Sequence, residues 1–203
     1  MSEALFGFLG VIVGAFITIF KESVAAWLAR RRNAEYLAIR VVSMLDEFVD
    51  GCAGVAGDNG YHDGHHVGVA TIQVPTPIFD VHDLDADWKS IPSKLMYETL
   101  SFPSLINASN QRIDGAFEYT ATPPDYDEGF EARQFEYSKL GLRAARLAEQ
   151  YRSSYGIPPK EVGRWNPVDY LAQTQDGILD QRARRAEQHT KLQQALKANN
   201  EGA

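Results

Sequence analysis

The chain opens with an uncharged apolar run. Residues 4–20 (ALFGFLGVIVGAFITIF) carry no charge, and Thr18 is the polar exception. As a helix rising ~1.5 Å per residue the run reaches roughly 25 Å, slightly short of the ~30 Å hydrocarbon core of a bilayer. No Pro or Gly follows before Gly51, so we expect one helix to continue past Lys21. The pattern predicts a single membrane-spanning helix.

The residues that flank this run predict its direction. Trp27 lies where an interfacial anchor is expected, and Arg30, Arg31 and Arg32 follow it, while Glu3 is the only charge before the run. Basic residues favour the cytoplasmic side. We therefore expect a protein of the cell membrane (the inner membrane in a Gram-negative cell), with its N-terminus outside and its C-terminal part in the cytoplasm.

Two alternatives explain the apolar run without a permanent anchor. A cleaved signal peptide has a basic start and a small-residue cleavage site in a loop. Here the start is acidic and the residues after the run have helical character, which favours an uncleaved anchor. A buried core helix is the other alternative, and the flanking Trp27 and arginines argue against it.

Small residues form a stripe on the predicted membrane helix. Gly10 and Gly14 are four residues apart, and Thr18 extends the stripe by another turn. This spacing lets two membrane helices approach closely. It indicates a possible self-association face.

A second apolar stripe begins at Ala34 and predicts the first helix of a bundle. Leu37, Val41 and Phe48 continue it at helical spacing, and we expect the helix to end near Gly51. Residues 51–66 are dense in glycine, which predicts a long loop. Residues 67–79 are rich in β-branched residues and predict a short strand or extended segment that lies over the bundle.

A second helix is predicted to begin at an N-cap on Ser90 and to run to about Tyr119. Pro92 is tolerated in its first turn, and Pro103 restarts or kinks it. The segment 122–125 (TPPD) then ends it.

The next helix has the clearest pattern. Phe130, Tyr137, Ala144 and Tyr151 recur every seven residues, with leucines between them, which indicates a bundle seam. Gly156 is the expected C-terminal glycine.

The last helix is predicted to begin at Asn166, its N-cap, with Pro167 as the first helical residue. Trp165 and Tyr170 occupy the positions of a hydrophobic staple. An early apolar stripe (Val168, Leu171, Ile178, Leu179 and Ala186) gives way to a polar tail.

These elements predict a mostly α fold. A single N-terminal transmembrane helix is followed by a cytoplasmic bundle of about four helices with one irregular, partly extended insertion. The expected organisation is an anchor and juxtamembrane segment (1–29), a bundle domain (30–185, with the insertion at 51–88) and a polar helical tail (186–203).

Composition narrows the possible partners. The 203 residues carry a net charge of −7, and the basic residues gather beside the apolar run and in the last helix. An acidic soluble part argues against nucleic-acid binding. The expected partners are the lipid bilayer, a second copy of the chain through the membrane helix or the bundle, and a protein of unknown identity. The single cysteine, Cys52, agrees with a reducing compartment.

Histidines and aspartates gather in the glycine-rich region and are the weak candidates for a metal site. They are His62, His65, His66, His82 and Asp83. Imidazole and carboxylate groups hold divalent transition metals. A flexible loop supplies no fixed ligand geometry, however, so a solvated polar loop is the favoured interpretation. The run Asp83-x-Asp85-x-Asp87 is not a calcium loop, because Trp88 occupies the position that requires glycine.

Charged residues around the Phe130 helix have ordinary structural explanations. The acids Asp125, Asp127, Glu128, Glu131 and Glu136 offset the helix dipole. Arg133, Lys139 and Arg143 are expected to form surface ion pairs with neighbouring acids. No nucleotide-binding, nucleophile or zinc-protease motif is found, and no cofactor is expected.

The sequence leaves three functional hypotheses. The favoured one is a non-enzymatic interaction or scaffold module on the cytoplasmic face of the membrane. A membrane-tethered metal-dependent sensor or enzyme would use the histidine region. A small membrane-acting effector would perturb the bilayer through associated anchors.

Overall fold

The computed structural model describes residues 2–61, 69–82, 84–161 and 163–201. For residues 2–19, 196 and 198–201 it describes the backbone alone. Within this description the chain has four α-helices and no strand, which confirms the predicted mostly α fold. The helices are α1 (Ser2–Ala56), α2 (Ser93–Tyr119), α3 (Asp127–Tyr155) and α4 (Pro167–Glu201), with a turn of 3-10 helix, η2 (Trp88–Ser90), before α2.

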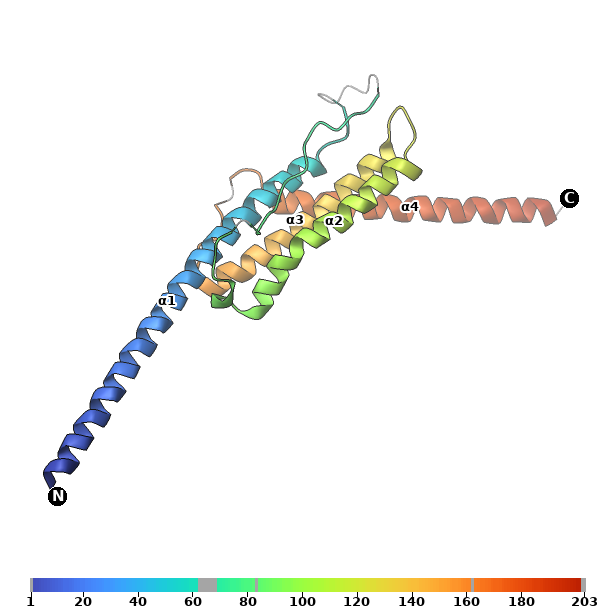
Figure 1. Ribbon diagram of the computed structural model, residues 1–203. Coiled ribbons are helices and arrows are strands. Elements are labelled where there is room, and N and C mark those ends of the chain that lie inside the picture. Colours follow the sequence, from blue (N-terminus) through green and yellow to red (C-terminus); the bar gives the residue numbers. More distant parts are fainter. Residues whose placement is uncertain (1, 62–68, 83, 162, 202–203) are drawn as a thin grey trace.

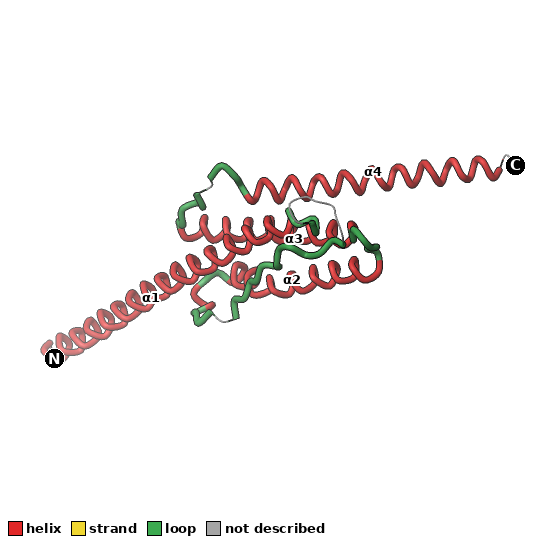
Figure 2. The backbone as a smooth tube through the Cα atoms, turned by 90° about the horizontal axis from the view of Figure 1, so that it is seen from above, coloured by secondary structure: helices red, strands yellow, loops and turns green. Residues whose placement is uncertain are grey.

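Helix α3 lies at the centre and contacts α1, α2 and α4. The first part of α1 projects from one end of the bundle and the last part of α4 from the other (Figure 1). Residues 20–33 of α1 are all exposed, and Ala34 is the first described residue that is buried. The view from above shows the same arrangement, with α3 between α2 and α4 (Figure 2). Helix α1 therefore joins the bundle through its second half.

The predicted seam of α3 is confirmed as the core. Its four heptad residues are buried, and so are Leu140 and Leu147 between them. On the same helix, a Cβ built on Gly141 would lie 2.6 Å from Leu171 Cδ1 of α4 and 2.8 Å from Cys52 Cβ of α1. The missing side chain lets three helices meet at this position.

Helix α1 does not end where the sequence predicts. It continues through Gly51 and Gly54 to Ala56, so the prediction of a loop from residue 51 was wrong for the first six residues. Burial explains this, because Cys52 and Val55 on these turns are completely buried. The glycines face the segment that lies over the helix, where a Cβ on Gly51 would meet Pro77 Cβ at 2.6 Å.

That overlying segment forms no strand within the described residues, so the strand is excluded and the extended segment remains as the prediction. Phe79 from this segment packs between Phe48 of α1 and Phe102 of α2. The three ring centroids lie 5.2–5.9 Å apart in edge-to-face geometry. Aromatic pairs of this kind prefer such geometry. The segment thus supplies core residues between α1 and α2.

One prediction for the start of α2 was wrong, and one of the two alternatives for Pro103 is excluded. Ser90 ends the short helix η2, and the N-cap of α2 is Pro92, which makes no side-chain cap bond. The helix does not restart at Pro103, since one α-helix runs through that residue. Phe102 beside it is completely buried, and tertiary packing of this kind outweighs the local cost of an interior proline.

The ends of α3 and α4 agree with the predicted signals. Gly156 adopts the left-handed conformation (φ 66°) after α3. Asn166 Oδ1 accepts a bond from the Val168 backbone N–H at 3.0 Å, and the rings of Trp165 and Tyr170 lie 6.0 Å apart. Leu171 and Ile178 are buried, whereas Leu179 and Ala186 of the predicted stripe are exposed, because α4 leaves the bundle there.

No helix in the described part of the chain is long and apolar enough to cross a membrane. The predicted span at residues 4–20 lies within α1, but Phe20 is the only one of these residues with a described side chain.

Candidate functional site

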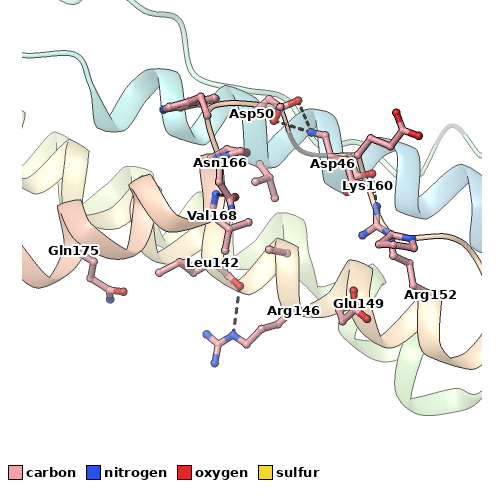
Figure 3. Close-up of a pocket in the computed structure, with 17 residues that line it drawn as sticks. Asp46, Asp50, Leu142, Arg146, Glu149, Arg152, Lys160, Asn166, Val168 and Gln175 are labelled. Carbon is pink, nitrogen blue, oxygen red and sulfur yellow. Dashed lines mark hydrogen bonds and ion pairs between the residues drawn. The ribbon is translucent and has the colours of Figure 1, made fainter.

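A cavity of about 820 Å³ lies between α1, α3, the loop from α3 to α4 and the start of α4. We call it the loop groove, and Figure 3 shows its lining. The residues that line it are Asp46, Val49, Asp50, Leu142, Ala145, Arg146, Glu149, Arg152, Pro159, Lys160, Glu161, Gly163, Trp165, Asn166, Pro167, Val168 and Gln175. Cavities of this size hold small molecules or the side chains of a partner protein.

One end of the loop groove is closed by an ion pair. Arg152, in the last turn of α3, donates to Asp46 of α1 at 2.5 Å, and its Nε donates to the Pro158 carbonyl at 3.2 Å. The Arg152 side chain is 9% exposed, so this pair is largely withdrawn from water. It fixes the start of the loop against α1.

The middle of the loop is fastened by a second ion pair. Lys160 donates to both carboxylate oxygens of Asp50 at 2.7 and 2.6 Å. At the far end of the loop, Asn166 caps α4 and fixes the direction of that helix. Because the loop is attached to α1 and to α4, the groove has defined walls. The dashed lines in Figure 3 mark the bonds between its lining residues.

The groove has an apolar floor and a charged rim. Val49, Leu142, Ala145 and Val168 supply apolar surface from three helices. On the rim, Arg146 donates to the Leu142 carbonyl of its own helix at 3.3 Å and forms no ion pair with the residues that the structure describes. Glu149 lies one turn further along α3 and forms no ion pair within the described part of the chain. The rim therefore offers one cation and one anion to a partner.

The groove lining holds carboxylates and a lysine but no hydroxyl, thiol or imidazole. None of its described residues is Ser, Thr, Cys or His, whereas Asp46, Asp50, Glu149, Lys160 and Glu161 are present. Asp46 and Asp50 are held by cations. The arrangement suits binding.

Comparison with protein-family models, with curated proteins and with solved structures finds no match for this chain. The function is therefore inferred from geometry alone.

Arg133 corrects the prediction of a surface pair. Its side chain is 2% exposed and bonds to Asp58, whose side chain is 1% exposed, at 2.8 Å. Burial raises the pKa of Asp58, but bonds from the backbone N–H groups of Val74, Gly60 and Gln73 and the charge of Arg133 outweigh it, so the pKa lies below its usual value. The pair is a structural centre inside the bundle.

Two predicted dipole acids also bridge helices. Glu136 is buried and accepts bonds from Ser109 of α2 at 2.7 Å and from Lys139 at 3.1 Å. Glu131 accepts from Arg182 of α4 at 2.8 Å and also from Arg185. Burial raises the pKa of both acids, but these bonds and the charges of the cations outweigh it, so each pKa lies below its usual value. Both carboxylates hold neighbouring helices on α3.

Of the candidate metal residues, the structure describes only His82. His62, His65, His66 and Asp83 lie outside the described residues. His82 is exposed, and its backbone N–H donates to Asp80 at 2.9 Å. Across the described ranges, no group of three or more His, Cys, Asp or Glu residues could hold a metal ion.

The predicted membrane-interface residues lie on the exposed part of α1. Trp27, Arg30, Arg31 and Arg32 are all exposed, and the Arg31 guanidinium lies 5.8 Å from the centre of the Trp27 ring. The predicted self-association stripe lies in α1 as well, but outside the described side chains. It consists of Gly10, Gly14 and Thr18.

Sequence reasoning missed the loop groove. Its two fastening pairs join residues 106 and 110 positions apart, which no local pattern reports. Pro158 and Pro159 indicated a loop but gave no indication that it covers a cavity.

Proposed function

We propose that this chain is a membrane-anchored, non-enzymatic interaction module whose bundle binds a protein partner in the loop groove. The observation that carries the proposal is the character of that groove. It has an apolar floor, and Arg146 and Glu149 on its rim form no ion pair within the described part of the chain. An apolar centre with a polar rim is typical of protein interfaces.

The anchoring part of the proposal rests on the sequence of residues 4–20 and on the course of α1. The helix is continuous from Ser2 to Ala56, and residues 20–33 are all exposed. This leaves the first half of α1 available to a bilayer, with the bundle on the cytoplasmic side where the arginines lie. The proposed location is the cell membrane.

The partner is proposed to insert an apolar side chain above Ala145 and to pair its own charges with Arg146 and Glu149. The test is purification of the intact protein from mild detergent, followed by mass spectrometry. A stoichiometric protein should be recovered, and the double variant Arg146→Glu/Glu149→Arg should lose it. Arg143→Glu is the matched control, since Arg143 is exposed on the same helix and does not line the groove.

Elemental analysis of the same sample tests the competing metal-dependent hypothesis. Stoichiometric metal that disappears on substitution of His62, His65, His66 and His82 by alanine would overturn the proposal. Equal recovery of the partner by the rim variant and by wild type would remove the groove from consideration.

Membrane anchoring is tested separately. The full chain should remain in the membrane fraction after alkaline carbonate washing, and deletion of residues 2–29 should release it. Recovery of the intact chain in the wash would contradict the anchor.

The anchors are further proposed to associate through Gly10, Gly14 and Thr18. The variant Gly10→Ile/Gly14→Ile should then reduce crosslinked dimer in membranes, because the larger side chains separate the helices. Unchanged crosslinking would remove this face from consideration.

A further inference from the structure

A second cavity, of about 380 Å³, lies where α1 leaves the bundle. It is separate from the loop groove, and we call it the basic pocket. Residues from α1, from the segment 89–92 just before α2 and from the end of α3 line it: Trp27, Arg30, Arg31, Ala34, Lys89, Ser90, Ile91, Pro92 and Tyr155. Three segments that are separate in the sequence therefore line one small space.

The described lining of the basic pocket is positively charged. It includes Arg30, Arg31 and Lys89, and no carboxylate. Arg31 is partly compensated by Glu35, which accepts its Nε–H at 3.1 Å. Arg30 and Lys89 form no ion pair within the described part of the chain. Two cations from different elements are thus available to a ligand.

Neutral donors and a helix end add to this charge. The Tyr155 hydroxyl and the Trp27 indole belong to residues of the lining, whereas the Ser90 hydroxyl already donates to the Asp87 carbonyl at 2.6 Å. Helix α2 begins beside the pocket at Pro92 and has no side-chain cap. The uncapped N–H groups of its first turn favour an anion. The N-terminus only supplements the side-chain cations.

We propose that the basic pocket binds a phosphate group, held by Arg30, Arg31 and Lys89. Guanidinium and ammonium groups bind phosphate through charge-assisted hydrogen bonds. The group could belong to an anionic lipid headgroup or be free in solution, and both present the same oxygens. The lipid source rests on the proposed membrane anchoring, whereas the free source does not.

The structure separates the pocket arginines from their neighbour. Arg32 follows Arg31 directly but does not line the pocket, and neither do Arg40 or Lys94. The test variant is Arg30→Gln/Arg31→Gln/Lys89→Gln. The control is Arg32→Gln/Arg40→Gln/Lys94→Gln, which removes the same charge from the same two regions of the chain.

Binding is measured by isothermal titration calorimetry on the full chain in uncharged detergent micelles. One titration uses inorganic phosphate. A second uses short-chain phosphatidylglycerol added to the micelles, with short-chain phosphatidylcholine as the neutral reference. The pocket variant should weaken binding about tenfold or more, whereas the control should change it by roughly twofold or less. Circular dichroism checks that both variants remain folded.

Each outcome decides the proposal. Saturable phosphate binding that only the pocket variant loses supports a free anion, and binding of phosphatidylglycerol alone with the same loss supports a headgroup. No saturable binding by wild type, or equal loss in both variants, overturns it. If the pocket variant unfolds, Lys89→Gln replaces it, since Lys89 is exposed, and unchanged binding by that variant also overturns the site. Release of the intact chain by carbonate, with phosphate binding retained, would refute the anchor alone.

Discussion

Arg133 and Asp58 lie 75 positions apart in the sequence and 2.8 Å apart in the structure, with both side chains almost completely buried. Asp58 also accepts backbone N–H bonds from Gly60, Gln73 and Val74, and Arg133 donates to the Val74 carbonyl. The pair therefore ties the end of α1 and the start of the extended segment to α3. It is one of several buried polar contacts in the core.

Breaking this pair should destabilise the bundle strongly. Arg133→Leu leaves the Asp58 carboxylate buried without its cation, and we expect a loss of ~3–5 kcal/mol in the free energy of unfolding. Thermal unfolding of the full chain in mild detergent, followed by circular dichroism, should show a fall in Tm of roughly 10 °C. Arg143→Leu, an exposed change on the same helix, should leave Tm nearly unchanged. A similar Tm for both variants would contradict a structural role for the pair.

The Asp58 carboxylate should also make the free energy of unfolding depend on pH. The folded pKa of Asp58 and of Glu136 lies below the usual values of ~3.9 and ~4.3, so the unfolded chain binds more protons and the free energy of unfolding rises with pH there. Their contribution is complete above about pH 5 and is lost as the pH falls through the folded pKa values.

Asp58→Asn should therefore reduce stability at pH 7 and flatten its dependence on pH between about 5 and 3. The measurement is chemical unfolding at several pH values. Asp176→Asn, on the exposed face of α4, serves as the control and should keep the wild-type slope. A wild-type slope in the Asp58 variant would assign the acid sensitivity to other groups.

Gly141 and Gly115 should respond in opposite directions to the same substitution. Gly141→Ala places a methyl group against Leu171 and Cys52, and we expect a loss of ~1–3 kcal/mol from overpacking. A Cβ on Gly115 meets nothing within 4 Å, so Gly115→Ala should gain ~0.5–1 kcal/mol from helix propensity. Thermal unfolding of the two variants compares them directly. Stabilisation by both would show that α1, α3 and α4 can separate without cost.

Cys52 should be inert in the folded protein. Its side chain is completely buried, and burial raises the pKa of its thiol, so little reactive thiolate forms. A maleimide should label it slowly in native protein and rapidly in denaturant. Gly141→Ala should speed native labelling, since its new methyl group lies against this residue. Rapid labelling of native wild type would contradict the packing of α1 against α3.

Local patterns predicted the elements whose cause is local. The heptad of Phe130, the glycine at Gly156 and the cap at Asn166 each depend on neighbours within a few residues, and the structure agrees with all three. The four-helix count followed from the same patterns.

The structure differs from the predictions where contacts between residues far apart in the sequence determine the local conformation. Gly51 predicted a break in α1, but the helix continues because Cys52 and Val55 beyond it are buried in the core, while the missing side chain lets Pro77 pack against Gly51. Arg133 was predicted at the surface because an arginine gives no sign of a buried partner 75 positions away. The loop groove and the basic pocket escaped prediction for the same reason, since each is enclosed by segments that only the fold brings together.

Helix α1 has no break between its projecting half and its packed half. Each residue adds a rotation of ~100° and a length of ~1.5 Å to an α-helix. The number of residues between the projecting half of α1 and Ala34 therefore sets the rotation of the bundle about the helix axis. One alanine inserted between Ser23 and Leu28 would swing the loop groove and the basic pocket about a quarter turn relative to the N-terminal half. Seven inserted residues would return both cavities almost to their original direction about the helix axis, about two helical turns further from the N-terminal half. Any structure that holds the first half of α1 in one orientation therefore also sets the direction in which both cavities face.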